Sequence, residues 1–213
     1  RFVAIVDNRD SRASRAWFGE RHEASHLIIP DPGAQVLWRR TTVERPEPLE
    51  EVVDSVASHV GFWSPIVRPV LQHALSSSPN ILDAFDHVRS AVASAASIES
   101  SYRAFARMVS FPLLMIRCDY DCRKSDTVDP TRSWALRAKT IIVNDAAEAI
   151  NLHVWENYRI PENSIPARGY AGNGASIVGI ENLGDWPTKT GRRLPRHHVQ
   201  IVSRGHWSAI RPV

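Results

Sequence analysis

A chain of 213 residues with only two cysteines lacks what several protein classes depend on. Cys118 and Cys122 are spaced C-x3-C and no second pair follows, which excludes a disulfide framework and a zinc-ribbon pattern. Free thiols explain the two cysteines better than a redox switch does. No run of about 18 apolar residues is present, so we expect no membrane span. The first residues also lack a charged-then-apolar signal segment, and we therefore expect a cytoplasmic protein.

A strong excess of one charge sign is missing too. The 26 basic and 23 acidic side chains leave a formal net charge of +3, which is too small to indicate direct nucleic-acid binding. Three arginines cluster at Arg192, Arg193 and Arg196, close to His197 and His198. A solvated surface loop and an anion site explain this cluster about equally well.

The spacing of apolar residues predicts a helical first half and a strand-rich second half. Helical spacing recurs over 12–29, 49–61, 67–75, 81–95, 98–109 and 145–158. Apolar and β-branched runs predict strands at 2–7, 112–118, 138–143, 176–181 and 198–202, with a strand pair or an extended loop at 36–43. We expect a polar loop at 119–132 and a glycine-rich turn at 169–174. The helices near 83–109 have a helix-turn-helix pattern, but without a basic recognition face we favour a plain helical hairpin.

One short motif carries the chemistry: His22-Glu23-Ala24-Ser25-His26 reads H-E-x-x-H inside a predicted helix. Histidines four residues apart lie on one face of a helix, one turn from each other, so both imidazoles can converge on one metal ion. Zinc lowers the pKa of a water it binds towards about 7, and Glu23 is placed to accept the proton of that water. The motif therefore predicts a zinc site with Glu23 as general base.

A catalytic zinc normally has three protein ligands and one open position. Position 32 is Pro, so a third histidine six residues after the motif is absent. The next predicted helix offers Glu50 and Asp54, which are four residues apart and share a face, whereas Glu51 would face away. We expect one of the pair to bind zinc and the other to hydrogen-bond a ligating histidine. The alternative for Glu50 is a carboxylate that only favours the N-terminus of its helix.

These residues resemble the ImmA/IrrE-like zinc metallopeptidases, whose active-site helix reads roughly R-x-x-F-T-x-x-H-E-x-x-H. The matching positions are Arg15, Phe18, His22, Glu23 and His26, with Gly19 in place of the threonine. The second family helix reads roughly E-x-x-A-(N/D)-x-F-A-(A/S), and residues 50–58, EEVVDSVAS, are similar to it. The resemblance covers about residues 1–70 and favours Glu50 over Glu51 as the third ligand, with Asp54 behind a histidine.

The resemblance implies a cytoplasmic zinc endopeptidase of narrow specificity that cleaves a regulatory protein such as a helix-turn-helix repressor. It implies an α+β fold in three parts: a zincin-like, mostly helical metallopeptidase domain (1–75), a helix-turn-helix-like connector (76–110), and a mixed α/β, GAF-like sensor domain (111–213). The last part is expected to hold a small signal ligand or the substrate protein.

The departures Gly19, Ala24 and Ser25 also fit a different reading, a non-catalytic regulator that binds a repressor or DNA with structural zinc or none. An open coordination position distinguishes a catalytic zinc from a structural one. His59 is expected to pack or to face solvent rather than to stabilise a transition state. We also expect no second metal site among His197, His198 and His206, because adjacent residues of a strand point to opposite faces.

Overall fold

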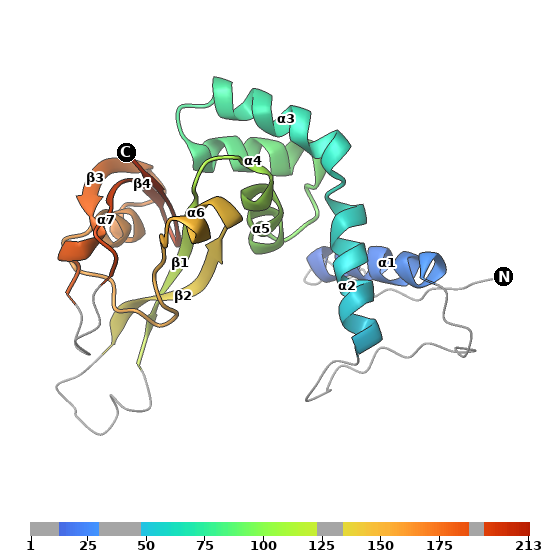
Figure 1. The fold of residues 1–213 in the computed structure, drawn as a ribbon, viewed down its shortest axis with the longest axis horizontal. Coiled ribbons are helices and arrows are strands. Elements are labelled where there is room, and N and C mark those ends of the chain that lie inside the picture. Colours follow the sequence, from blue (N-terminus) through green and yellow to red (C-terminus); the bar gives the residue numbers. More distant parts are fainter. Residues whose placement is uncertain (1–12, 30–47, 123–133, 188–193) are drawn as a thin grey trace. The chain divides into compact units, whose positions relative to one another are not determined.

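The computed structural model describes residues 13–29, 48–122, 134–187 and 194–213. Within these ranges the chain forms seven α-helices and a five-stranded antiparallel sheet, so the α+β class is confirmed (Figure 1). The chain divides into two compact units, residues 1–76 with 85–104 and residues 77–84 with 105–213. The zincin-like and GAF-like architectures stay predictions, as does the three-part division into domains.

Two helices of the first unit pack against each other and carry the H-E-x-x-H motif and Glu50. They are α1 (Ala13–Ile28) and α2 (Pro48–Gly61), within two residues of the predicted bounds. The Trp17 ring lies 5.0 Å from that of Phe62, which follows α2. Gly61 allows this close approach, because a Cβ there would lie 2.6 Å from the Trp17 ring. The absence of one side chain thus sets how closely α2 approaches α1.

The remaining helices of the first half form where helical spacing predicted them. They are α3 (Ser64–Ser77), α4 (Ile81–Val92) and α5 (Ile98–Met108). Pro65 lies in the first turn of α3, where no intrahelical donor is needed, and Pro69 lies inside the helix without ending it. The Phe85 and Tyr102 rings of α4 and α5 pack edge to face at 5.5 Å, and the Tyr102 hydroxyl donates to Asp86 at 2.8 Å.

The second unit is built on an antiparallel sheet with the strand order β2-β1-β5-β4-β3. Its strands are β1 (Leu114–Asp121), β2 (Ala135–Val143), β3 (Ile177–Asn182), β4 (His198–Arg204) and β5 (Trp207–Pro212). Alternate residues of the strands point to one face, where Leu114, Ile116, Val199, Ile201 and Ile210 join the main apolar core.

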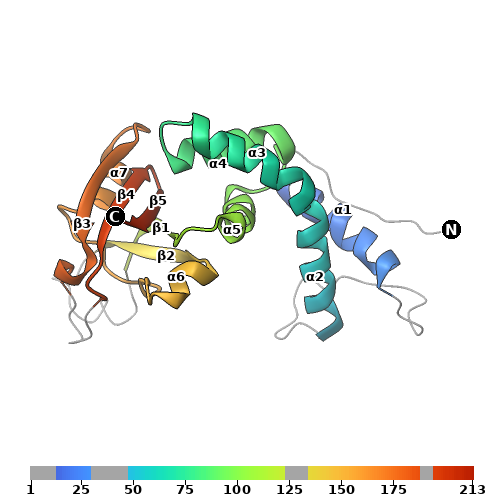
Figure 2. The same ribbon diagram turned by 45° about the horizontal axis from the view of Figure 1, so that its top comes forward.

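Two short helices lie against the sheet unit. Helix α6 (Asp145–Ala149) is capped by Asn144, and α7 (Ile165–Ala171) is capped by Ser164. Helix α7 lies against β3 and β4 (Figure 2). A Cβ on Gly169 would lie 2.9 Å from the backbone carbonyl carbon of Ser203, so glycine permits this packing. Burial raises the pKa of Cys118 in β1 to about 12, and neither Cys118 nor Cys122 forms a disulfide.

Several predictions for the second half were wrong. The helix expected at 145–158 ends at Ala149, because Asn151 and Asn157 adopt positive φ angles of 57° and 60° that an α-helix does not accommodate. The expected turn at 169–174 is confined to its last residues, because α7 continues to Ala171. The expected loop at 119–132 begins with the last residues of β1, and residues 123–132 lie outside the described residues. Strand β5 was not predicted. The expected strand at 2–7 and the segment at 36–43 lie outside the described residues.

Among the described residues, every helix is too short or too polar to cross a bilayer.

Candidate metal centre

Helix α1 brings His22 and His26 together by its own periodicity. The two Nε2 atoms lie 3.2 Å apart and the ring centroids 4.9 Å apart, with the rings nearly perpendicular. The His22 side chain is 2% exposed and that of His26 is 6% exposed, so neither imidazole is a freely rotating surface group. One turn of helix thus aims two nitrogen donors at a common point.

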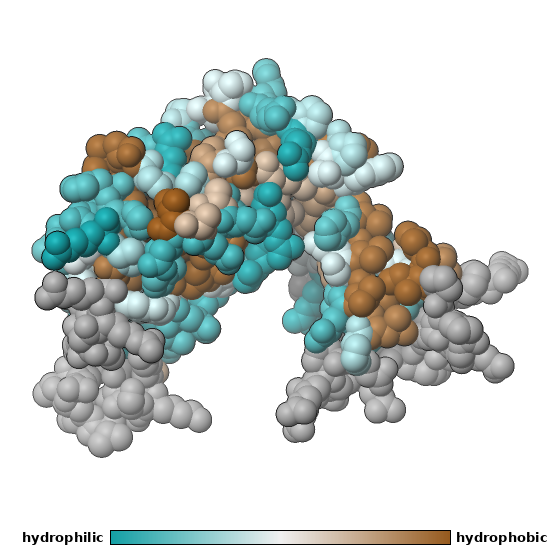
Figure 3. All heavy atoms as spheres, viewed as in Figure 1, coloured by the Kyte–Doolittle hydropathy of each residue, from teal (hydrophilic) through white to brown (hydrophobic). Residues whose placement is uncertain are grey.

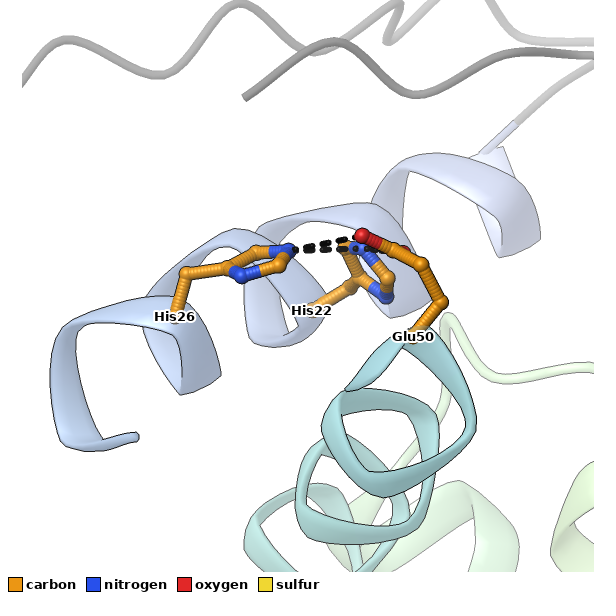
Figure 4. A group of neighbouring side chains, drawn as sticks. All are labelled: His22, His26 and Glu50. Atoms are coloured by element: carbon orange, nitrogen blue, oxygen red, sulfur yellow. Dashed lines mark hydrogen bonds and ion pairs between the residues drawn. The ribbon is translucent and has the colours of Figure 1, made fainter. Parts of the chain in front are cut away.

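Glu50 completes the group from α2. One of its carboxylate oxygens lies 3.2 Å from Nε2 of His22 and the other 3.7 Å from Nε2 of His26. The three ligand atoms all lie within 4.8 Å of one another (Figure 4). The structure therefore brings together the three residues that we expected to bind metal.

The geometry of these donors fits a tetrahedral zinc ion. Ligand atoms about 2.0–2.1 Å from such an ion lie about 3.3–3.4 Å from one another, which is close to the two shorter separations here. Two imidazoles and one carboxylate are also a donor set that zinc uses in catalytic sites, with a fourth position left open. The residues present therefore fit the metal that the motif implies.

Asp54 determines which nitrogen of His22 can bind a metal. Its Oδ1 lies 2.7 Å from Nδ1 of His22. Because a carboxylate can only accept, Nδ1 carries the proton, and in the neutral ring the lone pair is then on Nε2. That lone pair faces the Glu50 carboxylate, and two acceptors face each other favourably only when a cation or a proton lies between them. The Asp54 contact thus leaves Nε2 of His22 to face Glu50 across either a metal ion or a proton.

Glu23 and Glu51 follow the candidate ligands His22 and Glu50 in sequence, but their side chains have different surroundings. Glu23 is half-buried on α1, and no described residue forms a hydrogen bond or ion pair with its carboxylate. It projects from the helix about 100° away from His22, so it flanks the metal position without occupying it. Glu51 is exposed and takes no part in the three-residue group.

A cation–π contact lies within α1, and our sequence reasoning missed it. The Arg21 guanidinium lies 3.9 Å from the centre of the Trp17 ring and donates to the Trp17 carbonyl at 2.7 Å. Burial lowers the pKa of Arg21. The only available signal was an arginine four residues after a tryptophan, a spacing that places both on one helix face.

The other histidines lie apart from this centre. His59 is exposed, and its Nδ1 lies 2.7 Å from the Ser55 carbonyl of its own helix. His206 lies 2.7 Å from Asp119, and within the described ranges it does not join His197 and His198 in a second metal-ligand group. Arg192 and Arg193 lie outside the described residues, so the basic cluster near them stays a prediction.

Apolar side chains reach the surface of the two helices that carry the candidate ligands. Leu27 and Ile28 on α1 and Val52 on α2 are each more than half exposed, and apolar atoms gather over these two helices (Figure 3). Leu27 is one helical turn after Glu23 and therefore lies on the same side of α1. Exposed apolar areas beside a polar centre often mark binding surfaces.

No protein-family model matches the chain, and no curated protein matches it at a significant level. The likeness to ImmA/IrrE-like metallopeptidases therefore rests on the residues quoted above.

Proposed function

We propose that this chain is a zinc-dependent endopeptidase in which His22, His26 and Glu50 hold the metal. The observation that carries the proposal is the convergence of these three donors from two helices. Asp54 adds support, because it leaves Nε2 of His22 as the metal-binding nitrogen. If these residues had come together by chance on the surface, His22 would not need to be buried or to have its ring oriented by Asp54.

Each protein group has a defined task in peptide hydrolysis. When bound, zinc acts as a Lewis acid that polarises a carbonyl and lowers the pKa of a coordinated water. Glu23 accepts a proton as the water oxygen attacks the peptide carbonyl carbon. It then passes that proton to the amide nitrogen as the carbon–nitrogen bond breaks, which returns Glu23 to its starting state. No described residue forms a hydrogen bond or ion pair with the Glu23 carboxylate, which is consistent with this double role.

The proposed substrate is a cytoplasmic regulatory protein such as a helix-turn-helix transcriptional repressor, cleaved with narrow specificity. The support for this choice is the resemblance of residues 15–26 and 50–58 to the family motifs. The exposed apolar side chains of Leu27 and Val52 give an unfolded or extended protein segment a surface beside the metal.

Metal content of three proteins tests the ligand set. Elemental analysis is made on the wild type, on Glu50→Ala and on Glu51→Ala, which is the matched control one residue away and exposed. We expect about one zinc per chain in the wild type and in Glu51→Ala, and loss of zinc in Glu50→Ala. If Glu50→Ala retained its zinc, the third ligand would have to be another residue. A wild type that binds no metal even after zinc is supplied would rule the peptidase out.

A second measurement separates a catalytic zinc from a structural one. The protein is loaded with Co²⁺, whose visible spectrum reports coordination, and acetohydroxamate is added. A catalytic site keeps a position that the added ligand can occupy, so the spectrum should change. An unchanged spectrum would indicate a closed site and favour the non-catalytic regulator that binds a repressor or DNA.

A further inference from the structure

The sheet of the second unit carries an open groove with a volume of about 450 Å³. Its apolar walls are Phe111 and Pro112, which precede β1, Ile180 of β3, and Pro212 and Val213 at the end of β5. This volume falls within the range of about 300–1,000 Å³ that small-molecule sites occupy. The groove is therefore large enough for a small organic molecule.

The register of the strands places the groove on the face opposite the main core. Ile180 pairs with Gln200, and Gln200 pairs with Arg211, so these three side chains form a row across β3, β4 and β5. The neighbouring residues Val199 and Ile210 point the other way and are fully buried. A ligand in the groove would thus contact the sheet without disturbing that core.

The row ends in a cation that has no anionic partner among the described residues. The Nε of Arg211 donates to Oε1 of Gln200 at 2.8 Å, which orients the guanidinium and leaves its two terminal nitrogens available. No acidic side chain lines the groove. At the apolar end, 63% of Ile180 is exposed. The groove thus presents an oriented positive charge at one place and uncovered apolar surface at another.

We propose that this groove binds a small molecule with a carboxylate head and an apolar body. The guanidinium fork of Arg211 matches the two oxygens of a carboxylate, and the apolar body would cover Ile180 and Phe111. This gives a chemical class to the signal ligand expected for residues 111–213. The proposal does not depend on the metal centre, because none of the groove residues belongs to it.

Titration of the full 213-residue chain with hexanoate tests the charge requirement. Hexan-1-ol and hexylammonium, which have the same apolar body, serve as comparison ligands, and binding is followed by amide chemical shifts. We expect saturable shifts at the groove residues and the tightest binding for hexanoate. Arg211→Gln should weaken hexanoate binding by about tenfold or more and leave hexan-1-ol unchanged. Arg168→Gln, at an exposed arginine of α7, should change neither.

A second variant keeps the test decisive if Arg211→Gln fails to fold. Ile180→Asp places a negative charge at an exposed position of the groove and should abolish hexanoate binding. Equal binding of hexanoate and hexan-1-ol, or hexanoate binding that survives Ile180→Asp, would overturn the proposal. Glu50→Ala should bind hexanoate as the wild type does, so failure of the metal centre and failure of the groove can be told apart.

Discussion

The helix pair α1–α2 and the five-stranded sheet achieve their structures by different means. His22 and His26 meet because they are one turn apart in the same helix. In the sheet, Leu114 of β1 lies opposite Ile210 of β5, and most of the second unit separates the two in sequence. Local periodicity is enough for the first contact, whereas the second depends on packing of the whole unit. Function that rests on a helical motif is therefore readable from a sequence, and function that rests on sheet register is not.

The same difference runs through the candidate metal centre. The histidine pair is local, but Glu50 reaches it only because α2 packs on α1. The centre thus combines one contact set by sequence spacing with one set by tertiary packing. Variants that disturb the packing of α2 on α1 but leave the helical spacing of His22 and His26 intact can test this distinction.

The largest expected effect comes from Glu23→Gln. The amide keeps the shape of Glu23 but cannot accept a proton, so cleavage should fall by about 10²- to 10⁴-fold while zinc content stays unchanged. Cleavage is followed by mass spectrometry on a peptide that the wild type cuts. Glu20→Gln, an exposed position on the same helix, is the control and should keep its activity. Undiminished cleavage by Glu23→Gln would assign the base elsewhere.

Replacing one of two glycines by alanine should destabilise one region and leave the other unchanged. Gly61→Ala forces a Cβ to 2.6 Å from the Trp17 ring and 2.9 Å from the Arg21 side chain, and Gly169→Ala forces one against Ser203. Each change should destabilise its own unit by about 1–3 kcal/mol. Hydrogen exchange should show faster opening of α1 and α2 in the first variant and of α7 with β4 in the second.

Zinc affinity should be lower in Gly61→Ala than in the wild type, and it should be unchanged in Gly169→Ala. Ser55→Ala, at an exposed position of α2, is the control for the first change and should leave both exchange and affinity unaltered. If both glycine variants lost zinc equally, the distinction between the two regions would not hold.

Asp54 offers a smaller effect inside the centre. Asp54→Ala removes the acceptor that orients His22, so zinc affinity should fall by about 10- to 100-fold in a competition titration with a chelating dye. Asp54→Asn keeps a carbonyl oxygen that can accept from Nδ1, so it should retain most of the affinity. Equal losses in both variants would mean that the charge of Asp54 matters more than its hydrogen bond.

The smallest effect is expected at the edge of the sheet unit. The Lys139 ammonium donates to the Asp121 carboxylate at 2.5 Å, and this hydrogen bond holds the pKa of Asp121 below its ordinary value. A group with a lowered folded-state pKa stabilises the protein above its unfolded-state pKa of about 3.9 and loses that contribution as the pH falls through the folded-state value. The Tm of the wild type should therefore exceed that of Asp121→Asn near neutral pH.

The difference in Tm should shrink as the pH falls below about 4, and Lys139→Gln should remove the same pH-dependent part. A difference that stays constant down to low pH would show that Asp121 acts through packing alone.

Much of the first half could be predicted because helical contacts repeat at short range. The bounds of α1 and α2 follow from apolar spacing, and Glu50 and Asp54 share a face because they are four residues apart. The second half could be predicted less well. Strand β5 (Trp207–Pro212) is short and ends in proline, and only its pairing with β1 and β4 makes it a strand. Asn151 ends α6 by a backbone angle that apolar spacing does not reveal.

By itself, the sequence determined that His22 and His26 face one point and that Glu23 stands beside it, since an α-helix repeats every 3.6 residues. Only the tertiary structure decided that Glu50 lies 3.2 Å from His22 and that Ile180, Gln200 and Arg211 share one groove. The physical reason is the range of the forces involved. Helical hydrogen bonds join neighbours in the chain, whereas helix packing and strand register depend on side chains that meet only after the chain has folded.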